Sequence, residues 1–193
     1  ELPPKSELHV AMGWRDSELG GTGPAILVGR KRYDFGFGNP VGLAAMAYLG
    51  RGFYRNKIPL RAIGVFPTWD RLIFAVRKET GIESLEDVVK KRYPLRISTR
   101  RRVKLQTTVY AIEEVLKAYD ASFREIERWG GKIMEAPNPS GAVRRDHIES
   151  GAADAVFDEG VKSWGERALD AGMRFLPIND AAARHMQKIG CPS

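Results

Sequence analysis

Short apolar runs rich in strand-forming residues alternate along this chain with segments of helical periodicity. Residues 72–76 form one such run, and charged residues follow it. Ser84 then stands three residues before Asp87, a spacing that predicts a helix start of the capping-box type. Pro94 ends that helix because the residue before a proline is disfavoured in the helical conformation. Residues 95–97 begin a new strand, so this passage reads as strand, short helix and strand.

The remaining pattern predicts further strands and helices in alternation. The expected strands are residues 8–12, 33–38, 60–66, 132–136, 153–157 and 173–177. The expected helices are residues 25–29, 41–49, 142–149, 161–171 and 180–188. A further amphipathic helix begins near Gln106 or Thr107 and buries one apolar face. This alternation is typical of an α/β protein.

The composition sets limits on the class of protein. The chain has 193 residues, 43% hydrophobic and 28% charged, which suits one globular domain or two small lobes. No apolar run approaches the length of a membrane span. The first residues lack a signal-peptide pattern, which fits a cytoplasmic protein or a mature exported one. Cys191 is the only cysteine, so an intramolecular disulfide and a cysteine metal cluster are excluded.

The net charge of +7 raises the question of an anionic partner. The basic runs lie at residues 30–32, 90–92 and 100–104. They are interpreted either as separate solvated patches or as the wall of a cleft that attracts anions. Nucleic acid is the least favoured partner, because no zinc finger, RNA-binding motif or helix-turn-helix accompanies the charge.

The sequence offers no convincing catalytic constellation. His9, His147 and His185 are scattered, and none lies at metal-ligand spacing from another histidine or a cysteine. Asp146 adjoins His147, but adjacent residues on a helix do not face each other. The carboxylate pair at residues 158–159 could act as acid and base, yet an ion pair with the Arg100 region is the commoner explanation. We therefore expect no metal, no cofactor and no enzymatic turnover.

Polar side chains follow several of the expected strands. In open α/β sheets, ligands bind outside the carboxyl ends of the strands. The candidate ligand-binding residues are Asn39, Thr68, Trp69, Ser98, Thr99, Arg100, Thr107, Thr108 and Asp158. Arg100, next to hydroxyl groups and a helix N-terminus, would make a carboxylate clamp. Trp69 would supply an apolar wall, or alternatively lie in the core.

Several stretches together resemble a known family. The sequence RKETGIESLEDV, followed by PLRIST, resembles the passage between the lobes of type II periplasmic solute-binding proteins. The similarity is to the TAXI group, the solute receptors of some TRAP-type transporters. DFGFGNP at residues 34–40, SGAADAVF at 150–157 and MRFLP at 173–177 fit the same group in order and spacing, over residues 30 to 185.

This resemblance implies two α/β lobes, each with three αβα layers, and a chain that is incomplete at both ends. Lobe one would comprise residues 1–93 and 175–193, and lobe two residues 94–174. The lobes would be joined near residues 76–78 and again near 173–177.

The resemblance also implies a function. The protein would be a monomeric, periplasmic receptor that binds a small organic anion between its lobes and delivers it to membrane transporter subunits. Two alternatives remain on the same fold: a metabolite-binding enzyme, and the effector domain of a transcription regulator. A stable dimer would favour the regulator.

Overall fold

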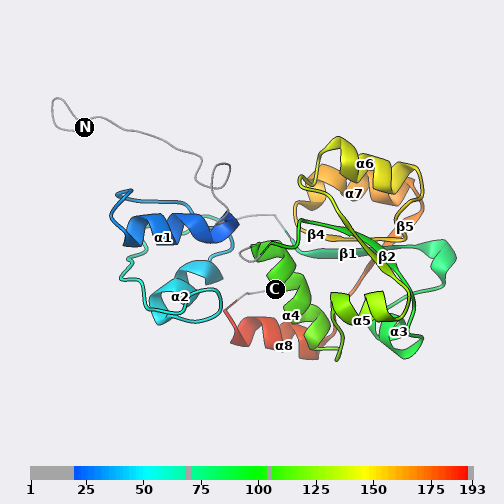
Figure 1. Ribbon diagram of the computed structural model, residues 1–193, viewed down its shortest axis with the longest axis horizontal. Coiled ribbons are helices and arrows are strands. Elements are labelled where there is room, and N and C mark those ends of the chain that lie inside the picture. The colour runs from blue at the N-terminus through cyan, green and yellow to red at the C-terminus, as the bar shows by residue number, and fades with distance from the viewer. Residues whose placement is uncertain (1–19, 68–70, 104–105, 191–193) are drawn as a thin grey trace.

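The computed structural model describes residues 20–67, 71–103 and 106–190. They form a five-stranded sheet with helices on both faces, and a smaller unit that contains two helices, α1 and α2 (Figure 1). The strand expected at residues 8–12 and the candidate residues Thr68 and Trp69 lie outside the described residues.

The elements alternate as the sequence pattern predicts, which confirms the α/β class. The strands are β1 (Ile73–Arg77), β2 (Arg96–Thr99), β3 (Lys132–Glu135), β4 (Ala155–Asp158) and β5 (Met173–Leu176). The α-helices are α1 (Gly23–Gly29), α2 (Gly42–Leu49), α3 (Leu85–Lys90), α4 (Thr107–Lys117), α5 (Phe123–Arg128), α6 (Ala142–Glu149), α7 (Val161–Asp170) and α8 (Asp180–Lys188). Short 3₁₀ turns cover Gly20–Thr22 and Lys78–Thr80. None of the described helices has the length and apolarity that a bilayer crossing needs.

The helix start expected at Ser84 is confirmed in detail. The Ser84 hydroxyl accepts a hydrogen bond from the Asp87 amide at 3.1 Å, and the Asp87 carboxylate accepts one from the Ser84 amide at 3.1 Å. Each side chain thus satisfies a backbone donor that the first turn of α3 leaves unpaired.

The sheet has the strand order β3-β2-β4-β1-β5. Strand β2 is parallel to β3 and β4, whereas β1 is antiparallel to both β4 and β5. Helices α6 and α7 cover one face, and α3, α4, α5 and α8 lie on the other (Figure 1). The sheet unit therefore has the three αβα layers that were expected of a lobe.

Side-chain alternation along the strands divides the core between these two faces. Phe74 and Phe157 belong to the larger cluster, on the side of α3, α4 and α5. Ala75 and Val156 belong to the smaller cluster, where Trp164 of α7 is 1% exposed. Residues that alternate in this way fix the register, because a shift by one residue would exchange the two faces.

The lobe boundary expected at residues 93 and 94 is wrong. Strand β1 is flanked by β4 and β5 in one continuous sheet, so residues 73–90 belong with residues 94–174. The physical reason is burial: Phe74, Ala75 and Val76 are at most 1% exposed, and an apolar strand of this kind needs a neighbour on each side. The sheet unit accordingly runs from about residue 71 through α8, because Ala182 and Met186 of α8 belong to the larger core cluster.

The α1/α2 unit, residues 20–67, packs beside the sheet unit. Leu43, Met46 and Tyr54 are buried in it, and the Phe53 ring lies 4.3 Å from that of Tyr110 in α4. Residues 33–38 and 60–66, both expected as strands, pair with no strand in the part of the chain that is described. Both segments have the apolar pattern of a strand, but a strand also needs a neighbouring strand to which it can form hydrogen bonds.

Candidate functional site

A broad cleft separates the α1/α2 unit from the edge of the sheet. The carboxyl ends of the parallel strands β2 and β4 lead into it, as does the N-terminus of α4. Its polar lining includes Asn39, Arg100, Thr107, Thr108 and Glu159. The site thus lies where an open α/β sheet is expected to bind a ligand.

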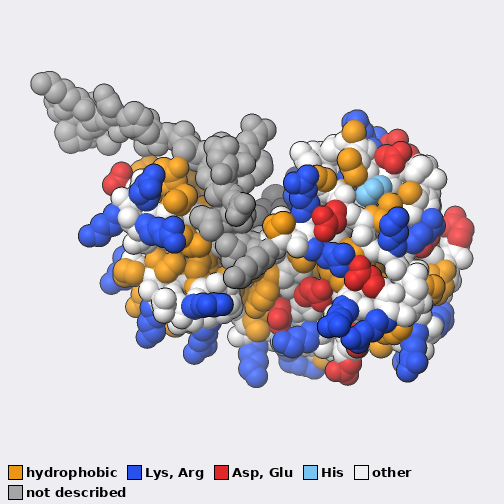
Figure 2. Space-filling view, in the orientation of Figure 1, with side chains coloured by type: hydrophobic (Ala, Val, Ile, Leu, Met, Phe, Trp, Pro, Cys, Tyr) orange, Lys and Arg blue, Asp and Glu red, His pale blue; other side chains and the backbone are white. Residues whose placement is uncertain are grey.

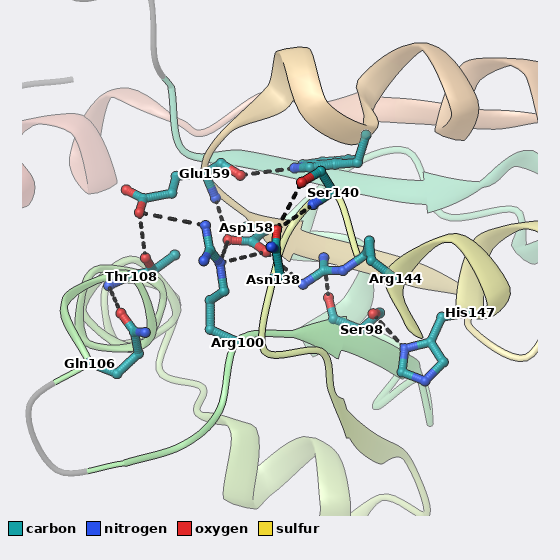
Figure 3. A network of polar contacts seen from close by, with 11 residues as sticks. Ser98, Arg100, Gln106, Thr108, Asn138, Ser140, Arg144, His147, Asp158 and Glu159 are labelled. Carbon is teal, nitrogen blue, oxygen red and sulfur yellow. Dashed lines mark hydrogen bonds and ion pairs between the residues drawn. The ribbon is translucent and has the colours of Figure 1, made fainter. Parts of the chain in front are cut away.

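Arg100 is the central cation of this cleft (Figure 3). Its Nε donates to both carboxylate oxygens of Asp158, at 2.8 and 3.0 Å. Its Nη2 lies 3.8 Å from Oε1 of Glu159, and its side chain is 16% exposed. The interpretation of residues 158–159 as ion-pair partners of Arg100 is therefore confirmed. Nη1 of Arg100 forms no hydrogen bond with any of the described residues.

A second arginine lies on the far side of Asp158. The fully buried Arg144 of α6 donates from Nη2 to Asp158 at 2.6 Å and from Nη1 to the Ser98 carbonyl at 3.3 Å. Burial raises the pKa of Asp158, and both guanidinium groups oppose that shift. Burial also lowers the pKa of Arg144 to about 10. Asp158 is thus the shared counter-ion of two cations, and it holds Arg100 in place at the rim of the cleft.

The start of α4 is tied to the end of β4. Thr108 donates from its hydroxyl to Oε1 of Glu159 at 2.8 Å, and the Gln106 side chain accepts from the Thr108 amide at 3.2 Å. Thr107 and Thr108 are 7% and 2% exposed. These contacts hold the N-terminus of α4 beside Arg100, as the sequence predicted.

Three candidate residues do not present their side chains to the cleft. Ser98, Thr99 and Asp158 are all fully buried. Successive β2 side chains point to opposite faces, so Ser98 meets α6 and its hydroxyl lies 2.8 Å from Nδ1 of His147. The Thr99 hydroxyl has no partner among the described residues. The expectation that these side chains touch a ligand is thus corrected: Asp158 supports Arg100, and the other two support the sheet.

The neighbours of Arg100 in the basic run differ in position. Arg101 is exposed and lines the cleft. Arg102 instead forms ion pairs with Glu127 at 3.0 Å and Glu135 at 3.6 Å, and it is absent from the cleft lining. The three arginines therefore have distinct environments, so each can serve as a control for the others.

Sequence reasoning missed Arg144 and the contact of His147 with Ser98. Arg144 belongs to a basic pair at residues 144–145 that looks exposed. The one sequence signal of its burial is that it precedes Ile148 by four residues. That spacing places Arg144 on the buried face of α6. His147 was set aside as a catalytic residue because its neighbour in the sequence, Asp146, cannot face it on a helix.

The arrangement provides a fixed cation and a helix N-terminus beside an open cleft. Among the described residues, no group of three or more His, Cys, Asp or Glu side chains is placed to hold a metal ion. The Ser98 hydroxyl is buried beneath α6, away from the cleft, and so is not exposed as a nucleophile. No protein-family model and no curated protein matches the chain. The functional interpretation therefore rests on the geometry of the cleft around Arg100.

The His147 contact predicts a pH dependence of stability. Burial, and then the charge of Arg144, lowers the pKa of His147 below its ordinary value. A lowered pKa means that the unfolded chain binds the proton more readily. The stability due to neutral His147 is therefore fully present above about pH 6.5 and is lost as the pH falls through the folded-state pKa.

Urea denaturation at pH 7.5 and pH 5 measures this effect. The free energy of unfolding of His147→Gln should fall less between the two pH values than that of the unchanged protein. Equal losses in both proteins would contradict the assignment.

Proposed function

We propose that the protein is a binding protein that captures a small organic anion of the carboxylate type in this cleft. One observation carries the proposal: Arg100 is held by Asp158 through Nε, and its Nη1 has no acceptor among the described residues. A guanidinium fixed at one edge can offer the other edge to a carboxylate without first losing side-chain freedom.

The surroundings of Arg100 support the same ligand class. The N-terminus of α4 borders the same cleft, and helix N-termini favour anions. Asn39 lines the cleft from the α1/α2 unit and could donate from its amide to a second oxygen of the ligand. Asp158 and Glu159 balance the charges of Arg100 and Arg144, so the empty cleft does not confine an uncompensated cation.

We further propose that the cleft lies between two lobes of a type II arrangement, with revised boundaries. The sheet unit is one lobe, and the α1/α2 unit belongs to the other. Strand β1 is preceded along the chain by the α1/α2 unit, so it connects the sheet to the proposed second lobe. A ligand that contacts both sides would stabilise the closed form.

In this proposal the closed form is the signal read by membrane transporter subunits, as in the TAXI group that the sequence resembles. The protein would then act as a monomer outside the cytoplasm. An enzyme on the same fold has less support, because the Ser98–His147 contact lies beneath α6 rather than in the cleft. A regulator domain would be recognised by a stable dimer in gel filtration.

The test is a ligand screen followed by substitution of the basic run. A thermal-shift screen of mono- and dicarboxylates, amino acids and phosphonates identifies a ligand, and calorimetry measures its affinity. We expect Arg100→Ala to weaken binding roughly 10- to 150-fold, since a charge-assisted bidentate contact contributes about 1.5–3 kcal/mol. Arg100→Lys should recover only part of the loss, because an ammonium group cannot reproduce the fork.

Two matched variants serve as controls. Arg102→Ala should leave the affinity unchanged, because Arg102 pairs with glutamates away from the cleft. Arg101→Ala should have a small effect that is confined to low salt. Equal, small losses in all three alanine variants would mean diffuse attraction by the basic run, and the proposed contact with Arg100 would be wrong.

A further inference from the structure

The charge of this protein is concentrated in its smaller unit. The whole chain has a net charge of +7. Residues 20–67 carry seven Lys or Arg and one Asp, a net charge of +6. The α1/α2 unit is therefore strongly basic, whereas the larger sheet unit contains opposite charges in similar numbers.

Most basic side chains of the α1/α2 unit have no carboxylate partner in the part of the chain that the structure describes. Six of them are exposed and form no ion pair with any described residue: Arg30, Lys31, Arg32, Arg51, Arg55 and Lys57. In the sheet unit, arginines such as Arg96, Arg167 and Arg174 are each paired with a carboxylate. Other exposed cations there, such as those of residues 90–92, form no ion pair with a described residue either. The α1/α2 unit differs because it contains a single acidic residue, Asp34, so its cations are in large excess.

Exposed apolar side chains lie next to these cations along the chain. Residues 30–32 directly follow α1, and Arg51 follows α2. Beside them Tyr33 is 40% exposed, Tyr48 53% and Leu49 45%. Figure 2 shows Lys and Arg side chains around apolar ones over the α1/α2 unit. We name the set formed by residues 30–33, 48–51, 55 and 57 the basic rim.

We propose that the basic rim docks on the surface of an anionic phospholipid bilayer. Lys and Arg near such a surface are attracted to its headgroups, and tyrosine rings prefer the headgroup level. Leu49 can enter the boundary between headgroups and acyl chains, as apolar residues of peripheral proteins do. Leucine has no ring to stack on a base, so the combination favours lipid over single-stranded nucleic acid.

Tyr48 also lines the cleft, but the six cations of the basic rim do not, and the test needs no cleft ligand. Sedimentation is measured with vesicles of phosphatidylcholine alone and with vesicles that contain about 30% phosphatidylglycerol, an anionic content at which basic segments bind. The unchanged protein should bind the anionic vesicles, and the binding should weaken with added salt. It should not bind the neutral vesicles.

The chain offers a matched pair of variants. Arg30, Lys31 and Arg32 are changed together to Gln in one variant, and Lys90, Lys91 and Arg92 in the other, so both lose three charges. The second run begins at the last residue of α3, in the sheet unit, and is exposed. At about 1 kcal/mol per cation, the first variant should bind anionic vesicles roughly 100-fold more weakly. The second should bind as the unchanged protein does.

Three outcomes would overturn the proposal. The first is that the unchanged protein fails to sediment with anionic vesicles at low salt. The second is an equal loss in the two variants, which would indicate attraction by net charge alone. The third is binding to a DNA or RNA oligonucleotide that depends on residues 30–32, without binding to vesicles. Failure of carboxylate binding in the cleft would leave these measurements unaffected.

Discussion

Asp158→Asn should lower the free energy of unfolding by about 3–5 kcal/mol, the largest effect that we expect from one substitution. The variant keeps the size of the side chain but removes the charge between two guanidinium groups. Arg144 is fully buried and donates to Asp158 at 2.6 Å, so its own charge would remain without compensation. Removing one partner of a buried ion pair typically costs this much, because the other charge is left desolvated.

Urea denaturation at neutral pH measures the loss, and the same strand segment supplies a control. Asp154 also pairs with an arginine, but its partner Arg96 is 47% exposed. Asp154→Asn should therefore cost about 1 kcal/mol or less. Adding Arg144→Met to Asp158→Asn should recover part of the stability, because the unpaired charge is removed with it. If both Asp→Asn substitutions lower the free energy of unfolding by the same amount, the buried charge of Arg144 does not need Asp158 as its counter-ion.

Arg77→Met should lower the free energy of unfolding by about 3 kcal/mol or more. Arg77 ends β1, and its guanidinium donates to three backbone carbonyls. Nε reaches Ala153 at 2.9 Å, Nη1 reaches Ala171 at 2.7 Å, and Nη2 donates to Ile148. Two of these carbonyls lie at the C-terminal ends of α6 and α7, where the helix leaves acceptors unpaired and a cation is favourable. The Ile148 carbonyl also accepts from the Gly151 amide at 3.4 Å, so the substitution leaves the Ala153 and Ala171 carbonyls unsatisfied, each at a cost of about 1–3 kcal/mol.

The neighbouring strand provides the control for Arg77. Arg174 in β5 pairs with Glu83, which is 73% exposed, so Arg174→Met should cost about 1 kcal/mol or less. Arg77→Lys should restore only part of the loss, since one ammonium group cannot reach three separate carbonyls. If Arg77→Met is no more destabilising than Arg174→Met in urea denaturation, the Ala153 and Ala171 carbonyls must find other donors.

The starts and ends of single helices were predictable because the residues that specify them lie close together in the sequence. The capping pair Ser84 and Asp87 gave the start of α3, and glycine and proline punctuation gave the bounds of α6 and α8 closely. The position of Arg100 at a strand end beside the start of α4 also follows from sequence order. These features depend on residues within one or two turns of each other.

Partners distant in the sequence were not predictable in the same way. The apolar run of β1 identifies a strand but not its neighbours, so its place between β4 and β5 was missed. The same holds for Arg144, whose burial depends on the approach of α6 to Asp158. Residues 33–38 show the converse, since their pattern is that of a strand although no described strand pairs with them.

The position of β1 inside the sheet, between β4 and β5, affects how the chain assembles during synthesis. Phe74 pairs with Leu176, about 100 residues later, and with Phe157 on the other side. At typical translation rates of about 5–20 residues per second, β1 emerges roughly 5–20 s before both of its neighbours exist. Throughout that interval its apolar side chains and unpaired backbone are open to other chains. We therefore expect a nascent chain stopped before β4 to be captured by holdase chaperones, and release to follow only when β5 has emerged.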